Sequence, residues 1–156
     1  MTRSHLSLLL ALAIAVPALA TAAAPYLSSH ASPCFSVGGS GYRLTGQSDA
    51  DYTIKIDRDA AEADLVLQIV DDPGSADFVL VDGADNSSSC ADARAIRTIR
   101  IDHQAREADL TIALASKTGP ADYKIYAQSA EFSGQDAAAL FAVMWKAGRK
   151  RDLAAR

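Results

Sequence analysis

The stretch that decides the fold is ADYTIKI, residues 50–56, because the same phrase returns four more times. It recurs as ADLVLQI (63–69), ADFVLVD (76–82), ADLTIAL (108–114) and ADYKIYA (121–127). A sixth copy, AIRTIRI (95–101), keeps the alternation but has Ile96 in place of Asp. The copies start at residues 50, 63 and 76 and again at 95, 108 and 121, so 13 residues separate neighbours within each triplet. Residues 53–82 align without a gap on 98–127 with 12 identities in 30, which indicates an internal duplication of a three-strand unit.

Each copy alternates between apolar and polar or small residues. This period of two, with β-branched and aromatic side chains, predicts strands that bury one face. Six residues occupy the same phase and should all point into the core: Ile54, Leu67, Leu80, Ile99, Ile112 and Ile125. Lys55, Gln68 and Arg100 lie on the opposite face, where replacement should cost little.

The short connections decide the expected topology. About six residues separate consecutive strands, whereas a parallel crossover usually takes a dozen or more, so hairpins are expected. Turn residues recur at matching places, in 71–74 and 117–120. The predicted fold class is therefore α+β: a six-stranded, mostly antiparallel meander made of two three-strand repeats, with one C-terminal amphipathic helix packed on the sheet.

The domain organisation follows from these elements. Residues 1–24 form an expected signal peptide, 25–49 a loop or edge segment, 50–132 the duplicated sheet (repeats 50–82 and 95–127), 133–151 a helix and 152–156 a tail. Ser133 can cap the helix. Its expected apolar face comprises Ala137, Leu140, Phe141, Met144, Trp145 and Gly148.

The first residues have the layout of a secretory leader. Arg3 precedes an apolar run from Leu6 to Val16, and two Ala-x-Ala sites follow. The alternative is an uncleaved membrane anchor. In an exported chain the cysteine pair, Cys34 and Cys90, predicts a disulfide. Free buried thiols, or a lipid on Cys34, are the alternatives. We expect a periplasmic or secreted protein with no membrane span after cleavage.

The charge distribution argues against nucleic acid as a partner. Residues 25–145 hold 9 Lys and Arg against 18 Asp and Glu, and such an acidic body repels nucleic acid. A basic cluster follows from Lys146 onward. It could touch an anionic surface, but such a cluster is more often the solvated end of a helix.

Motifs for chemistry are sparse. HExxH, CxxC, Walker A, GxGxxG and GxSxG patterns are all missing from the sequence, so no catalytic or cofactor residue is assigned. His103 follows a predicted strand, but Arg58 takes its place in the other repeat, which suggests a solvated turn. Carboxylates cluster in the first triplet and the connector, at Asp57, Asp59, Glu62, Asp64, Asp71, Asp72, Asp77, Asp82, Asp85 and Asp92. Their spacing matches no EF-hand.

The recurring Ala-Asp has a structural interpretation. Asp at a strand entry can cap local backbone N–H groups and keep the strand end polar. We therefore expect an exported, non-enzymatic domain that binds a protein or small-molecule partner in the envelope, without a cofactor. Two alternatives remain: a small secreted hydrolase that uses a carboxylate pair or His103, and a weak calcium-binding module.

Overall fold

The computed structural model describes residues 33–57, 60–81, 90 and 93–154. The expected signal peptide, residues 1–24, lies outside these residues. The elements run β1 (Cys34–Val37), β2 (Ser40–Leu44), β3 (Tyr52–Asp57), η1 (Ala60–Glu62), β4 (Leu65–Ile69), η2 (Pro73–Ser75), β5 (Phe78–Val81), β6 (Ala95–Ile101), β7 (Leu110–Leu114), β8 (Tyr123–Gln128) and α1 (Gly134–Ala154). Within the described ranges no helix combines the length and hydropathy needed to cross a bilayer.

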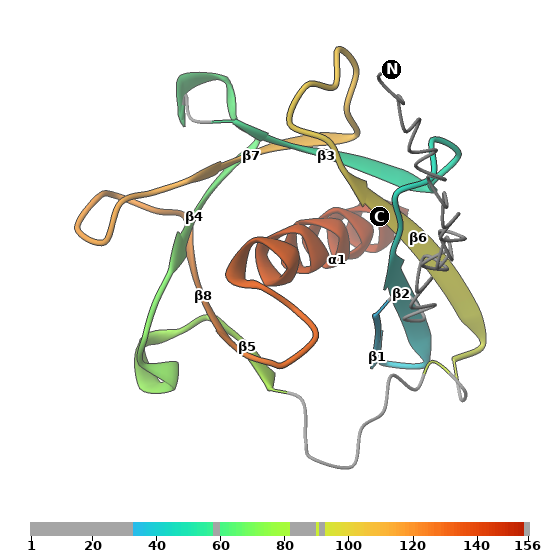
Figure 1. Ribbon diagram of the computed structural model, residues 1–156, viewed down its shortest axis with the longest axis horizontal. Coiled ribbons are helices and arrows are strands. Elements are labelled where there is room, and N and C mark those ends of the chain that lie inside the picture. The colour runs from blue at the N-terminus through green and yellow to red at the C-terminus, as the bar shows by residue number, and fades with distance from the viewer. Residues whose placement is uncertain (1–32, 58–59, 82–89, 91–92, 155–156) are drawn as a thin grey trace, which may run out of the picture.

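All eight strands belong to one curled sheet, in the order β1-β2-β6-β3-β7-β4-β8-β5 (Figure 1). Only β1 and β2 pair antiparallel, and the other six pairings are parallel. The prediction of a six-stranded antiparallel meander was therefore wrong in strand number, direction and order.

The two repeats interleave. The first triplet supplies β3, β4 and β5, and the second supplies β6, β7 and β8, so that strands of the two triplets alternate across the sheet. In the described part of the chain each of these six strands takes its hydrogen-bonded neighbours from outside its own triplet. Neither triplet is a sheet by itself, and the duplicated halves must fold together.

A constant stagger explains how connections this short can join parallel strands. Ile56 of β3 and Leu65 of β4 both pair with Ile112 of the intervening β7. In the same way, Ile69 of β4 and Phe78 of β5 both pair with Ile125 of β8. The end of one strand is thus level with the start of the next, so the chain only has to move sideways past one strand, about 10 Å. The connection does not have to return along the whole length of a strand, and that return is what normally makes parallel crossovers long.

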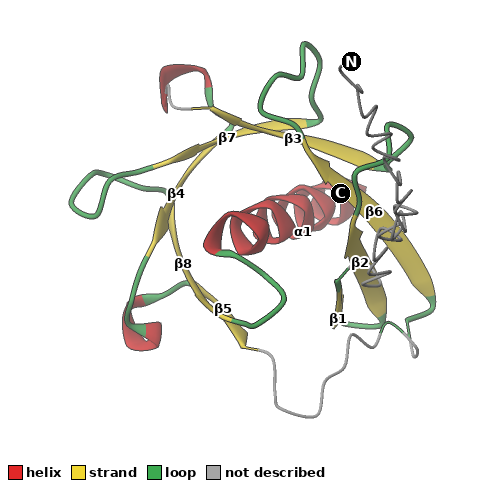
Figure 2. Cartoon of the chain, in the orientation of Figure 1, coloured by secondary structure: helices red, strands yellow, loops and turns green. Residues whose placement is uncertain are grey.

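The same stagger shapes the sheet around the helix. Adjacent repeat strands are offset by two residues, as Ile54 opposite Leu110 illustrates. An offset of two residues per strand spacing corresponds to a tilt of about 54°. Such steep tilt opens the curl, and α1 lies inside it, while the short turns η1 and η2 lie outside (Figure 2).

The core forms between the inner face of the sheet and this helix. All six residues predicted to point inward are at most 1 % exposed, which confirms the phase of the alternation. They belong to one cluster with Leu140 and Val143 of α1. The even offset of two residues keeps every strand's apolar set on the same face, because an odd offset would turn it outward.

The helix differs from the expected amphipathic helix on a flat sheet. Ala137, Ala138 and Ala139 are consecutive and all fully buried, although they point in three directions around the helix. A helix that is buried all round is surrounded by protein rather than laid on a surface. The curled sheet supplies that surrounding, and small side chains let its wall approach the helix closely.

The outer face is also partly covered, which changes the expectation for Gln68. Its side chain is only 6 % exposed. Nε2 donates to the carbonyl oxygens of Ser116 and Lys117, at 2.9 and 2.7 Å. The connection between β7 and β8 therefore folds over the outside of the sheet, and replacing Gln68 should cost more than the sequence pattern suggested.

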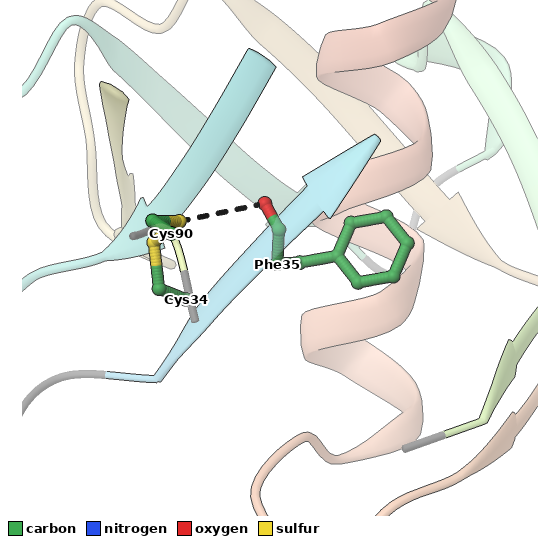
Figure 3. Close-up of a disulfide and its surroundings, with 3 residues drawn as sticks. All are labelled: Cys34, Phe35 and Cys90. Carbon is green, nitrogen blue, oxygen red and sulfur yellow. Dashed lines mark hydrogen bonds between the residues drawn. A yellow bond between two sulfur atoms is a disulfide. The ribbon is translucent and has the colours of Figure 1, made fainter. Parts of the chain in front are cut away.

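The predicted disulfide between Cys34 and Cys90 is present, with a Cα–Cα distance of 5.8 Å (Figure 3). It ties β1 to the connector between the triplets. Both sulfurs lie against β1 and β2, and Cys90 Sγ is 3.8 Å from the carbonyl oxygen of Phe35. A Cβ on Gly41 would lie 2.7 Å from Cys90 Sγ, so this position requires glycine.

Candidate functional site

The Ala-Asp residues form a ladder of hydrogen bonds along the amino-terminal ends of the strands. One carboxylate oxygen of each Asp accepts a backbone N–H from the strand that precedes it in the sheet, at 2.7 to 2.9 Å. The acceptors and donors are Asp51 with Thr98, Asp109 with Thr53, Asp64 with Thr111, Asp122 with Val66, and Asp77 with Lys124. In the last four pairs the Asp N–H returns a bond to the carbonyl of the same residue.

This ladder corrects the expected role of the phrase. The caps were predicted to be local, whereas each carboxylate bonds 47 or 56 residues away, in the other triplet. The arrangement also accounts for the copy that lacks Asp. Strand β6 is the first of the six repeat strands, and its preceding neighbour is β2, which is not a repeat strand. An Asp at position 96 would therefore have no repeat strand to bind, and the sequence has Ile96 there instead.

Asp51 accepts two hydrogen bonds at one carboxylate oxygen. Asp51 Oδ2 accepts the backbone N–H of Thr98 at 2.7 Å and its hydroxyl at 2.9 Å. These bonds, the backbone one first, hold the pKa of Asp51 below its ordinary value. The folded protein therefore stabilises the charged form of the Asp51 carboxylate.

The other carboxylates considered as calcium ligands are dispersed. Asp57 is paired with Lys55 and Asp71 with Lys117, both at 2.7 Å, and the second pair is almost fully exposed. Asp72 accepts the backbone N–H of Gly74. Asp59, Asp82, Asp85 and Asp92 lie outside the described residues. The described residues contain no group of three or more His, Cys, Asp or Glu side chains placed to hold a metal ion.

His103 lies at a cavity of about 690 Å³ near the carboxyl-terminal ends of the strands. The cavity is lined by Ile56, Asp57, His103, Leu114 and Gln135. Nδ1 of His103 is 3.3 Å from the carbonyl oxygen of Ile56. In the tautomer that carries the proton on Nδ1, this nitrogen donates to the carbonyl and Nε2 is an acceptor.

This cavity brings together only part of what the hydrolase hypothesis needs. Asp57 and His103 line it together, but a second carboxylate is not among its described lining residues, and neither is a Ser, Thr or Cys nucleophile. Gln135, from the first turn of α1, was not singled out in the sequence. Its position follows from the helix entering the curled sheet at this end, which no local pattern reveals.

The two end strands of the sheet, β1 and β5, do not pair with each other, and Figure 1 shows their ribbons apart, on either side of the opening of the curl. We call the line between them the seam. The ring of Phe35 on β1 contacts that of Phe78 on β5 edge to face, with centroids 6.3 Å apart, and Phe78 also contacts Phe141 of α1. These partly buried rings belong to the inner side of the seam, because they pack against the core.

Three exposed apolar side chains belong to the end strands β1 and β5, whereas a fourth, Ile96, belongs to β6, two strands away from β1. The large hydrophobic residues that are exposed in the described chain are Val37, Val79, Val81 and Ile96. Val79 and Val81 are 46 % and 53 % exposed, and both belong to β5. A smaller cavity of about 300 Å³ adjoins the end of this strand, lined by Val81, Gln128, Ser129 and Ala130.

Comparison of the chain with protein-family models, with curated proteins and with solved structures gives no match.

Proposed function

We propose that this chain is an exported, non-enzymatic binding protein that accepts an extended polypeptide segment at the free edge of β5. The observation that carries the proposal is the position of β5 at the end of a parallel sheet, with Val79 and Val81 exposed. A strand edge with unpaired backbone groups is a template for another strand, and main-chain hydrogen bonds supply much of the affinity.

The backbone direction at this edge follows from the ladder. Alternate residues of a strand direct their N–H and C=O groups to opposite neighbours. Phe78 and Leu80 face the partner strand β8, by analogy with β4, where the Leu67 carbonyl accepts the Ala115 N–H on the β7 side and the Val66 carbonyl accepts the Asp122 N–H on the β8 side. Val79 and Val81 therefore direct their N–H and C=O groups away from β8, toward the seam.

The described residues of β5 also lack the side chains that usually protect an exposed edge. Exposed edges are commonly blocked by Lys, Pro, inward-pointing charges or bulges. The four residues of β5 are Phe-Val-Leu-Val, and none of them is charged or a proline. At the opposite end of the sheet, by contrast, β1 is anchored by the Cys34–Cys90 disulfide. The edge of β5 is thus the better candidate for a binding surface.

Hydrogen exchange tests the binding proposal. A suitable probe is the acetylated and amidated heptapeptide with the sequence of residues 121–127, ADYKIYA, because it already forms a strand in this sheet. We expect it to slow exchange of the Val79 and Val81 amides in the disulfide-bonded protein. Val79→Pro removes the outward N–H without removing a bond to β8 and should abolish the effect, whereas Val79→Thr, which keeps the N–H, should not. Unchanged exchange at both amides would refute the proposal.

Export is supported by the leader layout together with the intramolecular disulfide, since disulfides persist in oxidising compartments. The amino terminus of the protein isolated from its host should then fall between Thr21 and Tyr26, as measured by mass spectrometry of the intact chain. Isolation of the uncleaved chain from the cytoplasmic fraction would contradict this.

A small hydrolase is the second candidate, and the cavity with Asp57 and His103 favours it. In that case His103→Gln and Asp57→Asn should each abolish turnover of small ester or glycoside substrates, while Val79→Pro leaves it intact. If the unmodified protein does not hydrolyse such substrates, this candidate fails.

A further inference from the structure

We infer that the segment accepted at β5 is a parallel strand, offset by two residues, with an aspartate immediately before its first inward-facing residue. This inference rests on the proposed function and adds the direction and chemistry of the occupant. The inference is based on a repeated contact: four successive repeat strands make the same pair of hydrogen bonds with an Asp of the next strand. Val79 occupies the equivalent position on the last strand, β5.

The same pair of hydrogen bonds recurs from one strand to the next along the ladder. In β7, β4, β8 and β5, each leading Asp binds the residue in the third position after the leading Ala of the preceding strand's copy. That residue donates its N–H to the carboxylate and accepts the Asp N–H at its carbonyl, over 2.7 to 2.9 Å in both directions. The residues so bound are Thr53, Thr111, Val66 and Lys124.

The equivalent residue of the last strand is Val79. It follows Ala76 by three positions, as Val66 follows Ala63 and Lys124 follows Ala121. Its N–H and C=O face the seam, in the direction in which the other four residues meet their Asp. The edge of β5 therefore presents the donor and acceptor pair that this sheet binds elsewhere with an aspartate.

The residue after the incoming aspartate has a defined position. At each interface the residue that follows the Asp pairs with the fourth-position residue of the preceding strand, as Phe78 pairs with Ile125. On β5 the fourth-position residue is Leu80. In this sheet the residue after the Asp is Tyr, Leu or Phe, and all five copies direct it inward. An aromatic or leucine side chain there would pack beside Leu80 and the Phe35–Phe78 rings of the seam.

Direction and stagger follow as well. An antiparallel segment would reverse the order of donors and acceptors opposite Val79, and its leading carboxylate would lie beyond Val81 rather than at Val79. A parallel segment without the aspartate would leave the Val79 N–H to water. Loss of one rim cap of this kind corresponds to about fivefold in affinity.

Peptide variants separate this inference from the proposal beneath it. The probe is again ADYKIYA, compared with AAYKIYA, in which only the aspartate is replaced, and binding is measured by the anisotropy of a carboxyl-terminal fluorophore. We expect the Asp→Ala peptide to bind about fivefold more weakly. A nitroxide on the amino terminus of the peptide should broaden the Asp77 amide more strongly than the Val81 amide.

The outcomes are distinct. Equal affinity of the two peptides, or stronger broadening at Val81, would overturn the inference while leaving strand binding at β5 intact. Absence of any peptide-dependent protection at Val79 and Val81 would overturn both. Because protection and broadening are measured on the unsubstituted protein, neither test depends on whether the Val79→Pro variant folds.

Discussion

The ladder makes a quantitative prediction at Asp122. Asp122→Ala removes the carboxylate oxygen that lies 2.8 Å from the Val66 N–H but leaves the Asp122 backbone bond in place. The freed N–H is at an exposed rim, where water can bind it, so the loss resembles that of a capping residue, about 1 kcal/mol. For a domain of this size that corresponds to a melting temperature lower by about 3–5 °C.

Matched variants show whether this loss belongs to the ladder. Asp122→Asn keeps an acceptor oxygen and should stay within about 0.5 kcal/mol of the parent protein. Asp64→Ala and Asp77→Ala should behave like Asp122→Ala. Asp49 is an exposed turn residue whose side chain makes no hydrogen bond or ion pair with the described residues. Asp49→Ala should therefore have no measurable effect on stability.

Urea denaturation followed by circular dichroism, with and without 5 mM calcium chloride, is the assay. Calcium should leave every midpoint unchanged, because the carboxylates are engaged with backbone N–H groups. A midpoint raised by calcium and returned to its original value by Asp64→Asn or Asp77→Asn would refute the structural role and support the calcium module. An Asp122→Ala loss no greater than that of Asp49→Ala would equally contradict the reasoning.

Three further predictions concern other parts of the fold. Gln68→Ala should lower the free energy of unfolding by about 1–3 kcal/mol in urea melts, because two carbonyls lose a buried donor. Reduction of Cys34–Cys90, which are separated by 56 residues, should cost about 4 kcal/mol, and thiol titration of the unreduced, denatured chain should find no free thiol. Asp51 has a lowered pKa, so its contribution is complete above the ordinary value of 3.8 and is lost as the pH falls through the folded-state value. The stability of Asp51→Asn should therefore depend less on pH below 4 than that of the parent, as measured by urea melts at each pH.

The candidate sites could be predicted only in part. The leading Asp residues were visible as a repeated signal, and their role as caps follows from side-chain chemistry. Their partners were not visible, because the bound N–H groups are 47 or 56 residues away. His103 was noted, but its cavity with Gln135 depends on where the helix enters the sheet. Gln68 was assigned to a solvated face because the alternation does not show that a connection folds over it.

The sequence by itself determined the number and phase of the repeat strands, the residues of the core, the disulfide and the presence of a terminal helix. Each depends on a periodicity or composition that is local in the chain, or on the pairing of two cysteines. Only the tertiary structure decided that the triplets interleave, that the strands run parallel and that the helix is enclosed. A two-residue stagger keeps the same side chains buried in either topology, so the apolar pattern is compatible with both. The choice is made by hydrogen bonds between distant segments, and the leading Asp residues are the part of the sequence that forms them.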